Sequence, residues 1–271
     1  TITDGTNNGS TAAFGAITGT FSDDTTAPGL STLTTADIDG DGYIDRLVAT
    51  FDEPVNDATT IVAGNFSTSA GTVTAVVDDG SSGDAVIWVN LTDGVLLTDA
   101  VPSLTIGAGG IEDLPGNANS LIAGFASTDT TGPAILSAVA SDETNILVGI
   151  DSDDTVTITF SEATSQPGIN AGNIDSVLGL NNAHVWIDGA AGITGAVWSG
   201  GGTVLTVTLS DTTSDPTVAV GDTITLDGTT IDDGLANSSS TAASPAITGV
   251  FGADSTPPTI TDRETVDLDG D

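Results

Sequence analysis

An acidic segment in the first part of the chain carries the residues best suited to chemistry. It reads Asp37-Ile38-Asp39-Gly40-Asp41-Gly42-Tyr43-Ile44-Asp45. Carboxylates at positions 1, 3, 5 and 9, with glycine at position 6, match the first nine positions of a calcium-binding loop. Alternate side chains in such a tight loop converge on one point, and the main-chain carbonyl of residue 7 adds another oxygen. We therefore predict a Ca2+ site formed by Asp37, Asp39, Asp41, Tyr43 and Asp45.

This loop differs from an EF-hand in its second half. Position 12 is Val48, where an EF-hand has a bidentate glutamate, and the following residues predict a strand and not a helix. The missing ligands would come from water or another loop, with Glu53 a candidate because it follows that strand. The alternative is that the two Asp-Gly pairs are turn dipeptides. Four carboxylates this close repel one another without a cation, which favours calcium.

A short motif recurs along the chain and divides it into repeats. The segment at 24–28 (Asp-Thr-Thr-Ala-Pro) returns with one change at 129–133 (Asp-Thr-Thr-Gly-Pro) and with two changes at 254–258 (Asp-Ser-Thr-Pro-Pro). Such self-similarity is typical of tandem modules. We predict four pieces: the tail of a preceding repeat at 1–24, full repeats at 25–129 and 130–254, and the start of a further repeat at 255–271.

Further acidic clusters follow from this repeat pattern. The calcium-type start returns at 267–271, and the middle repeat has a longer variant between Asp142 and Asp154, where a cation site and a plain loop are both open. Aspartates also precede each repeated proline, and other acidic residues stand just before the motif, so domain ends would meet in an acidic joint. Such a joint either binds metal or is a solvated linker stiffened by proline. The members of the expected joint cluster are Asp23, Asp24, Asp129, Asp254, Asp4, Glu112, Asp113, Asp232 and Asp233.

Short strands are the elements that must position these loops. Residues 155–160 and 203–209 alternate Thr with Val, Ile or Leu, the period of a half-buried strand. Further strands are expected at 47–51, 72–77, 85–91, 104–106, 135–140, 222–226 and 247–251. No long stretch has helical spacing, so the fold class predicted is all-β, with tandem Ig-like antiparallel β-sandwich domains. Trp88, Trp186 and Trp198 are interpreted as core or partly buried strand residues, the alternative being a ligand-stacking platform.

Composition excludes several functions. Two basic residues stand against 38 acidic ones, for a net charge of -36, so no surface can neutralise nucleic-acid phosphates. No apolar run is long enough to insert into a membrane. The chain has no cysteine or lysine and one histidine, which leaves little for nucleophilic or acid–base catalysis. A carboxylate pair of the glycosidase type, Glu53 or Glu162 with Asp52, is disfavoured because the glutamate recurs in each repeat; we expect no enzyme.

The repeated motifs also carry a family likeness. The order is D-x-T-x-P, then D-x-D-G-D-G-x-I-D, then Thr-Phe-Asp-Glu at 50–53 or Thr-Phe-Ser-Glu at 159–162, then Asn65-Phe66 or Asn173-Ile174. This pattern resembles the bacterial Ig-like repeat domains of surface-layer proteins and large calcium-dependent adhesins. The resemblance implies a secreted, calcium-dependent array of β-sandwiches on the cell surface, in which modules serve as stalks or lattice units.

The function expected is therefore a structural calcium-binding module of an extracellular array, whether surface layer, filament or adhesin stalk, without catalysis. Its partners would be copies of itself or neighbouring repeats of the same polypeptide. The alternative is an adhesin or carbohydrate-binding module, for which a surface glycan would be the partner and exposed indole rings the signature.

Overall fold

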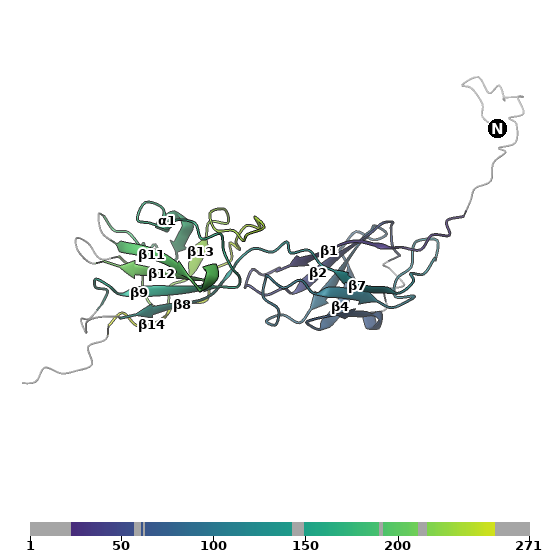
Figure 1. The fold of residues 1–271 in the computed structure, drawn as a ribbon, viewed down its shortest axis with the longest axis horizontal. Helices are drawn as coiled ribbons and strands as arrows, with labels where there is room; N and C mark the ends of the chain where they lie inside the picture. Colours follow the sequence, from purple (N-terminus) through teal and green to yellow (C-terminus); the bar gives the residue numbers. More distant parts are fainter. Residues whose placement is uncertain are drawn as a thin grey trace, which may run out of the picture.

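The computed structural model describes residues 23–56, 61, 63–142, 149–189, 192–210 and 216–252. These residues form two bodies, each around its own hydrophobic core, and the bodies lie end to end along the long axis (Figure 1). We call them the first unit, whose core residues lie between Leu33 and Ile111, and the second unit, whose core residues lie between Ile135 and Ile247.

The first unit consists of two antiparallel sheets. Four strands pair in the order β1-β2-β5-β4, and three pair in the order β3-β6-β7. A short 3-10 turn, η1 (Ala63–Asn65), leads into β3. The strands are β1 (Leu30–Ala36), β2 (Arg46–Phe51), β3 (Phe66–Thr68), β4 (Val73–Asp78), β5 (Val86–Leu91), β6 (Ser103–Ile106) and β7 (Ile122–Ala126).

The second unit repeats the main sheet strand for strand. Its order β11-β12-β9-β8 matches β4-β5-β2-β1, and β14 adds to the β8 edge in parallel. A second sheet pairs β10 with β13. Among the described residues no helix is long and apolar enough to cross a membrane. The elements are β8 (Ile135–Ser141), β9 (Thr155–Phe160), α1 (Ile174–Val177), β10 (Leu178–Leu180), β11 (Ile193–Ser199), η2 (Gly200–Gly202), β12 (Val204–Leu209), β13 (Ile224–Leu226) and β14 (Thr248–Gly249).

Alternation along the central strands builds each core. Strands β2, β5, β9 and β12 bury every second residue, because successive side chains of a strand point to opposite faces of its sheet. Both sheets of the first unit contribute to one core, as when Leu47 and Val89 cluster with Phe66 and Leu104. The prediction of an all-β protein with antiparallel sheets is therefore confirmed.

The strands that sequence patterns missed are those with weak alternation. β1, β3, β7, β10 and β11 were not predicted, and the sequences of β1 (LSTLTTA), β7 (IAGFA) and β11 (ITGAVWS) contain glycine, serine or consecutive threonines. These strands form because an adjacent strand supplies the pairing and an apolar face, which outweighs weak local preference. The expected strand at 247–251 shortens to the two residues of β14.

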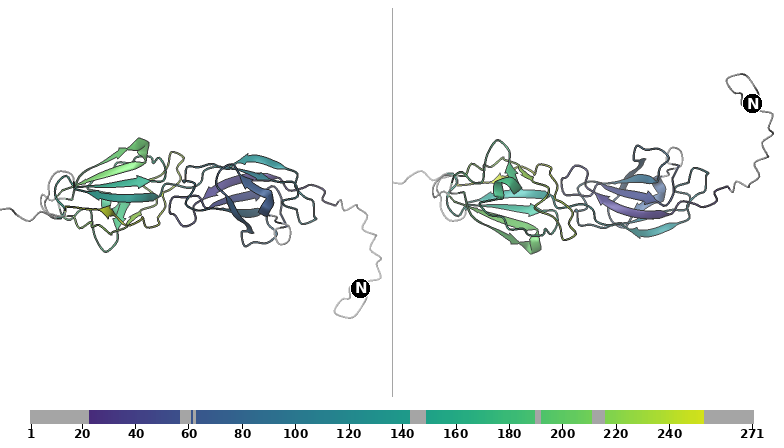
Figure 2. Two further views of the ribbon diagram at one scale, coloured as in Figure 1. Left: turned by 90° about the horizontal axis from the view of Figure 1, so that it is seen from below. Right: turned by 90° about the horizontal axis from the view of Figure 1, so that it is seen from above.

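A short connection joins the two units. Residues 127–133 leave β7 and run beside the end of β1, where the Thr35 N–H donates to the Thr128 carbonyl at 3.1 Å and the Thr130 hydroxyl donates to the Thr35 carbonyl at 2.6 Å. A bond between the hydroxyls of Thr98 and Ser161, 2.7 Å long and buried, crosses directly from one unit to the other. The units lie end to end in all three views (Figures 1 and 2).

Gly132 is a sensitive point of this connection. A Cβ atom there would lie 2.0 Å from the main-chain oxygen of Ser238. We expect Gly132→Ala to lower the free energy of unfolding of the second unit by about 1–3 kcal/mol, the cost of overpacking a closely packed site. Urea denaturation measures the loss. Gly168→Ala, where a Cβ meets nothing within 4 Å, is the matched control and should change stability little; equal losses in the two variants would contradict the prediction.

Candidate metal centres

The loop after β1 brings three of the predicted aspartates together. Asp37, Asp39 and Asp41 each offer a carboxylate oxygen, and these oxygens lie within 4.8 Å of one another. Main-chain N–H groups hold the loop in shape: those of Gly40 and Gly42 donate to the two oxygens of Asp37 at 2.7 and 2.9 Å. Both glycines have positive φ, which the tight turn requires.

The other two predicted ligands lie at the edge of this set. Asp45 is outside the group of three; its Oδ2 accepts a hydrogen bond from the Ile38 N–H at 3.2 Å, while its Oδ1 is buried without a partner in the described part of the chain. Tyr43 forms an isolated antiparallel bridge with Leu97 and donates its N–H to Asp41 at 3.0 Å. The structure thus brings together the first three carboxylates of the predicted five-ligand set.

Electrostatics in this loop favour a positive partner. Burial raises the pKa of Asp37, the N–H groups of Gly42 and Gly40 lower it, and the charges of Asp39 and Asp45 raise it again, for a net upward shift. Burial and neighbouring carboxylates likewise raise the pKa values of Asp41 and Asp45 above their ordinary range. A bound cation would relieve this repulsion.

The loop also contacts the second unit. The Ser240 hydroxyl donates to the Gly40 carbonyl at 2.9 Å, and a Cβ on Gly42 would come within 2.8 Å of the Leu136 side chain. A cavity of about 270 Å3 opens between the units, lined by Asp37 and Gly40 on one side and by residues including Thr130 and Gly132 on the other. The acidic loop is therefore part of the joint between the units.

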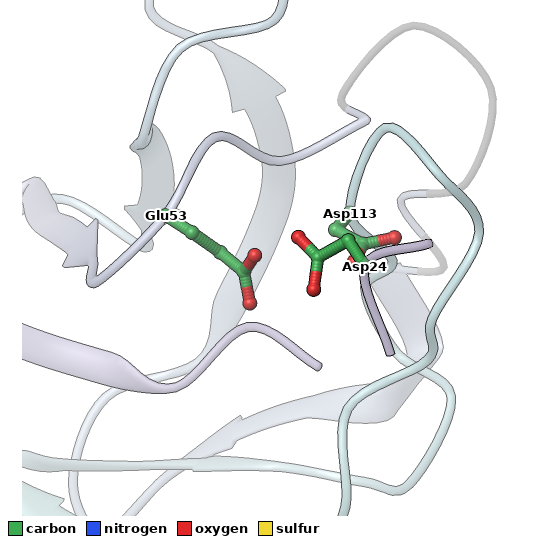
Figure 3. A group of neighbouring side chains, drawn as sticks. All are labelled: Asp24, Glu53 and Asp113. Carbon is green, nitrogen blue, oxygen red and sulfur yellow. The ribbon is translucent and has the colours of Figure 1, made fainter. Parts of the chain in front are cut away.

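A second group of carboxylates lies at the far end of the first unit. Asp24, Glu53 and Asp113 offer oxygens within 4.8 Å of one another, with Glu53 reaching in from one side and Asp24 and Asp113 from the other (Figure 3). Asn117 organises this group: its side-chain amide donates to Asp113 at 2.6 Å and to the Asp24 carbonyl at 3.0 Å. We call this group the first triad.

The second unit carries the same arrangement at the joint. Asp129, Glu162 and Asp233 offer oxygens within 4.8 Å of one another, and we call them the second triad. The Asn237 amide donates to Asp233 at 2.8 Å and to the Asp129 carbonyl at 3.4 Å, as Asn117 does in the first triad. Residues from three separate segments thus meet in the same way in both units.

Burial distinguishes the second triad from exposed acidic groups. Glu162 is 4% exposed and Asp233 5% exposed. Burial raises the pKa of Glu162 to about 7; the Thr98 hydroxyl lowers it, and the carboxylates of Asp129, Asp233 and Asp99 raise it. In the first triad, burial and then Asp24, Asp113 and Asp52 raise the pKa of Glu53. Burial also acts to raise the pKa of Asp113, but hydrogen bonds from Asn117 and from main-chain N–H groups together lower it.

Sequence patterns had located part of these triads. The aspartates of both belong to the joint cluster predicted from the repeats, but no pattern showed that the glutamates of the Thr-Phe-[Asp/Ser]-Glu motif would join them. Their recurrence in both repeats was the available signal. Asp4, Asp254 and residues 267–271 lie outside the described residues. The expected acidic loop of the middle repeat lies partly outside them. Its described aspartates, Asp142, Asp151, Asp153 and Asp154, are in none of the three groups.

The tryptophans and the histidine have structural surroundings. Trp186 is fully buried, Trp88 and Trp198 are half-buried, and the Arg46 guanidinium lies 4.0 Å from the centroid of the Trp88 ring. The only histidine, His184, contacts Asp222 at 2.7 Å, and Asp222 also accepts the Ala219 N–H at 2.7 Å, which ties two loops of the second unit together.

Comparisons with protein-family models, with curated proteins and with solved structures find no match to this chain.

Proposed function

We propose that this chain is a structural module of an extracellular array, built from tandem Ig-like β-sandwich repeats whose joints are stiffened by Ca2+. In this role it performs no catalysis, and its partners are neighbouring repeats and further copies of the chain at the cell surface. Cation binding removes the repulsion that an acidic joint would otherwise suffer, so that consecutive units hold one relative orientation.

The observation that carries this proposal is that the Asp37 loop lies at the contact between the two units. Three carboxylates converge within 4.8 Å in a loop that is also hydrogen-bonded to the second unit through Gly40 and Ser240. Hard cations such as Ca2+ select carboxylate and main-chain carbonyl oxygens, which this loop supplies. A loop of that composition at a contact between units can couple cation binding to the rigidity of the array.

Two further features support a structural role. The main sheets of the two units have the same strand order, as expected for repeats of one module. The net charge of -36 makes the chain strongly self-repelling, and divalent cations would counter this locally at the joint.

Thermal unfolding tests the proposal. In millimolar Ca2+ the chain should unfold at a higher temperature than in chelator at the same ionic strength. When Ca2+ is at 100 times its dissociation constant, its binding should raise the free energy of unfolding by about 2.7 kcal/mol. The Asp37→Asn, Asp39→Asn double variant should lose part of this gain. Asp78→Asn, Asp79→Asn is the matched control, because these aspartates also accept turn N–H groups but belong to no cluster. A Ca2+ effect that Mg2+ reproduces in full, or that both double variants retain, would count against the loop.

A further inference from the structure

The second triad differs from the Asp37 loop in that two of its carboxylate side chains are buried. Exposed carboxylates are commonly solvated, and a loop of aspartates often serves only to cap its own N–H groups. Glu162, in contrast, is 4% exposed, and its Oε1 atom is buried without any hydrogen-bond partner among the described residues. A buried carboxylate oxygen left without a donor costs free energy, so such an atom requires an explanation.

The surroundings of Glu162 offer acceptors and few donors. Its carboxylate points into the space it shares with Asp129 and Asp233, where the ligand atoms of all three lie within 4.8 Å. Asp233 is held in place by the N–H groups of Leu235 and Asn237, at 2.8 and 2.7 Å, and Asp129 by the N–H of Thr131 at 3.0 Å. These bonds orient two carboxylates toward the third and supply no positive charge.

The same arrangement in the first unit shows that the second triad is not an accident of one loop. In the first triad, Glu53 also has a buried Oε1 without a partner in the described part of the chain. Asn117 bridges Asp113 and the Asp24 carbonyl there, as Asn237 bridges Asp233 and the Asp129 carbonyl here. The two triads therefore have the same arrangement, and each contains a buried glutamate oxygen without a hydrogen-bond partner among the described residues.

We propose that Asp129, Glu162 and Asp233 form a divalent-cation site distinct from the Asp37 loop, and that Asp24, Glu53 and Asp113 form its counterpart in the first unit. The ligand class is a hard cation with oxygen ligands, Ca2+ before Mg2+, because carboxylates from three separate segments give an irregular set that suits the flexible coordination of calcium. The cation supplies the missing partner of the glutamate Oε1.

The second triad has a consequence for the joint that the first does not share within this chain. The Thr98 hydroxyl of the first unit lies 2.7 Å from the hydroxyl of Ser161, the residue before Glu162, and this contact is buried. The Thr131 hydroxyl donates to the Thr98 carbonyl at 2.8 Å, next to Asp129. Because the first unit closes over the triad, a cation there fixes the two units against each other. This part of the inference deepens the proposed function and rests on it.

Calorimetric titration of the full chain with Ca2+ tests the site itself. Glu162→Gln keeps the shape of the side chain and removes its charge, and we expect it to weaken binding at one site at least tenfold. Glu53→Gln should weaken a different site by a similar factor. The Asp37→Asn, Asp39→Asn variant should leave both of these sites in place. Unchanged titrations for Glu162→Gln and Glu53→Gln would overturn the proposal, whatever the Asp37 loop does.

Distance measurements between spin labels test the effect on the joint. The chain has no cysteine, so Ser120→Cys in the first unit and Ser199→Cys in the second, both exposed, allow labelling at chosen positions. We expect Ca2+ to narrow the distribution of distances at least twofold, and Glu162→Gln to abolish this narrowing. Narrowing that survives Glu162→Gln but is lost in the Asp37→Asn, Asp39→Asn variant would assign the joint to the loop alone; the triad proposal would then fail while the proposed function stood.

Discussion

Replacing Trp186 by alanine is expected to destabilise the second unit by about 3–5 kcal/mol, the range for deleting a large buried aromatic side chain. Trp186 is fully buried in the core of that unit. Its indole N–H donates to the Leu178 carbonyl at 2.6 Å, and its main-chain N–H donates to Asp175 at 2.7 Å. The substitution removes a large apolar volume and leaves the Leu178 carbonyl without its donor.

Differential scanning calorimetry with circular dichroism measures this loss without relying on tryptophan fluorescence. Trp88→Ala is the comparison: this ring is half-buried in the first unit and lies under the Arg46 guanidinium, 4.0 Å from the ring centroid. Losing that contact and part of the packing of the ring should lower the free energy of unfolding of the first unit by about 1–2 kcal/mol. A loss for Trp186→Ala no larger than that for Trp88→Ala would show that the core of the second unit does not depend on the indole.

Glu162→Gln is expected to stabilise the cation-free protein at pH 8 and to have little effect at pH 4. Burial raises the pKa of Glu162 to about 7 from its ordinary 4.5. Below pH 4.5 the carboxyl is protonated in both folded and unfolded chains. Between pH 4.5 and 7 the unfolded chain releases its proton first, so folding becomes less favourable, and the full penalty remains above pH 7. At pH 8 the substitution removes this uncompensated buried charge and should raise the free energy of unfolding by about 2–3 kcal/mol.

Urea denaturation in chelator at the two pH values measures this difference. Saturating Ca2+ at pH 8 should reverse the sign, so that the wild type becomes the more stable protein, because only the charged side chain gains a cation as partner. Glu112→Gln is the control of equal chemistry, since Glu112 is outside all three clusters. If Glu162→Gln is less stable than the wild type at pH 8 in chelator, the charged carboxylate is stabilised by a partner within the folded protein, and the prediction is wrong.

The strands that could be predicted are those whose residues alternate strongly. Residues 155–160 become β9 and 204–209 become β12, each burying every second side chain as its Thr–Val pattern indicates. β1 and β11 could not be predicted in the same way, because their threonine, serine and glycine content shows weak periodicity and their formation depends on pairing with β2 and β12.

The candidate site of the Asp37 loop could likewise be predicted in part only. Asp37, Asp39 and Asp41 are near in sequence, so spacing alone predicted that their carboxylates converge. Asp45 stands at the ninth position of that pattern, yet its carboxylate turns back to the Ile38 N–H, since local hydrogen bonding decides the direction of a side chain at the end of a loop.

By itself, the sequence determined that this protein is an acidic, cysteine-free, all-β chain with repeated motifs and a cluster of closely spaced aspartates. Only the tertiary structure decided that Glu162 joins Asp129 and Asp233, and that Thr98 of the first unit contacts Ser161 beside Glu162. The reason is physical: these residues are far apart along the chain, and their approach depends on strand pairing and on the contact between the units, which no local pattern encodes.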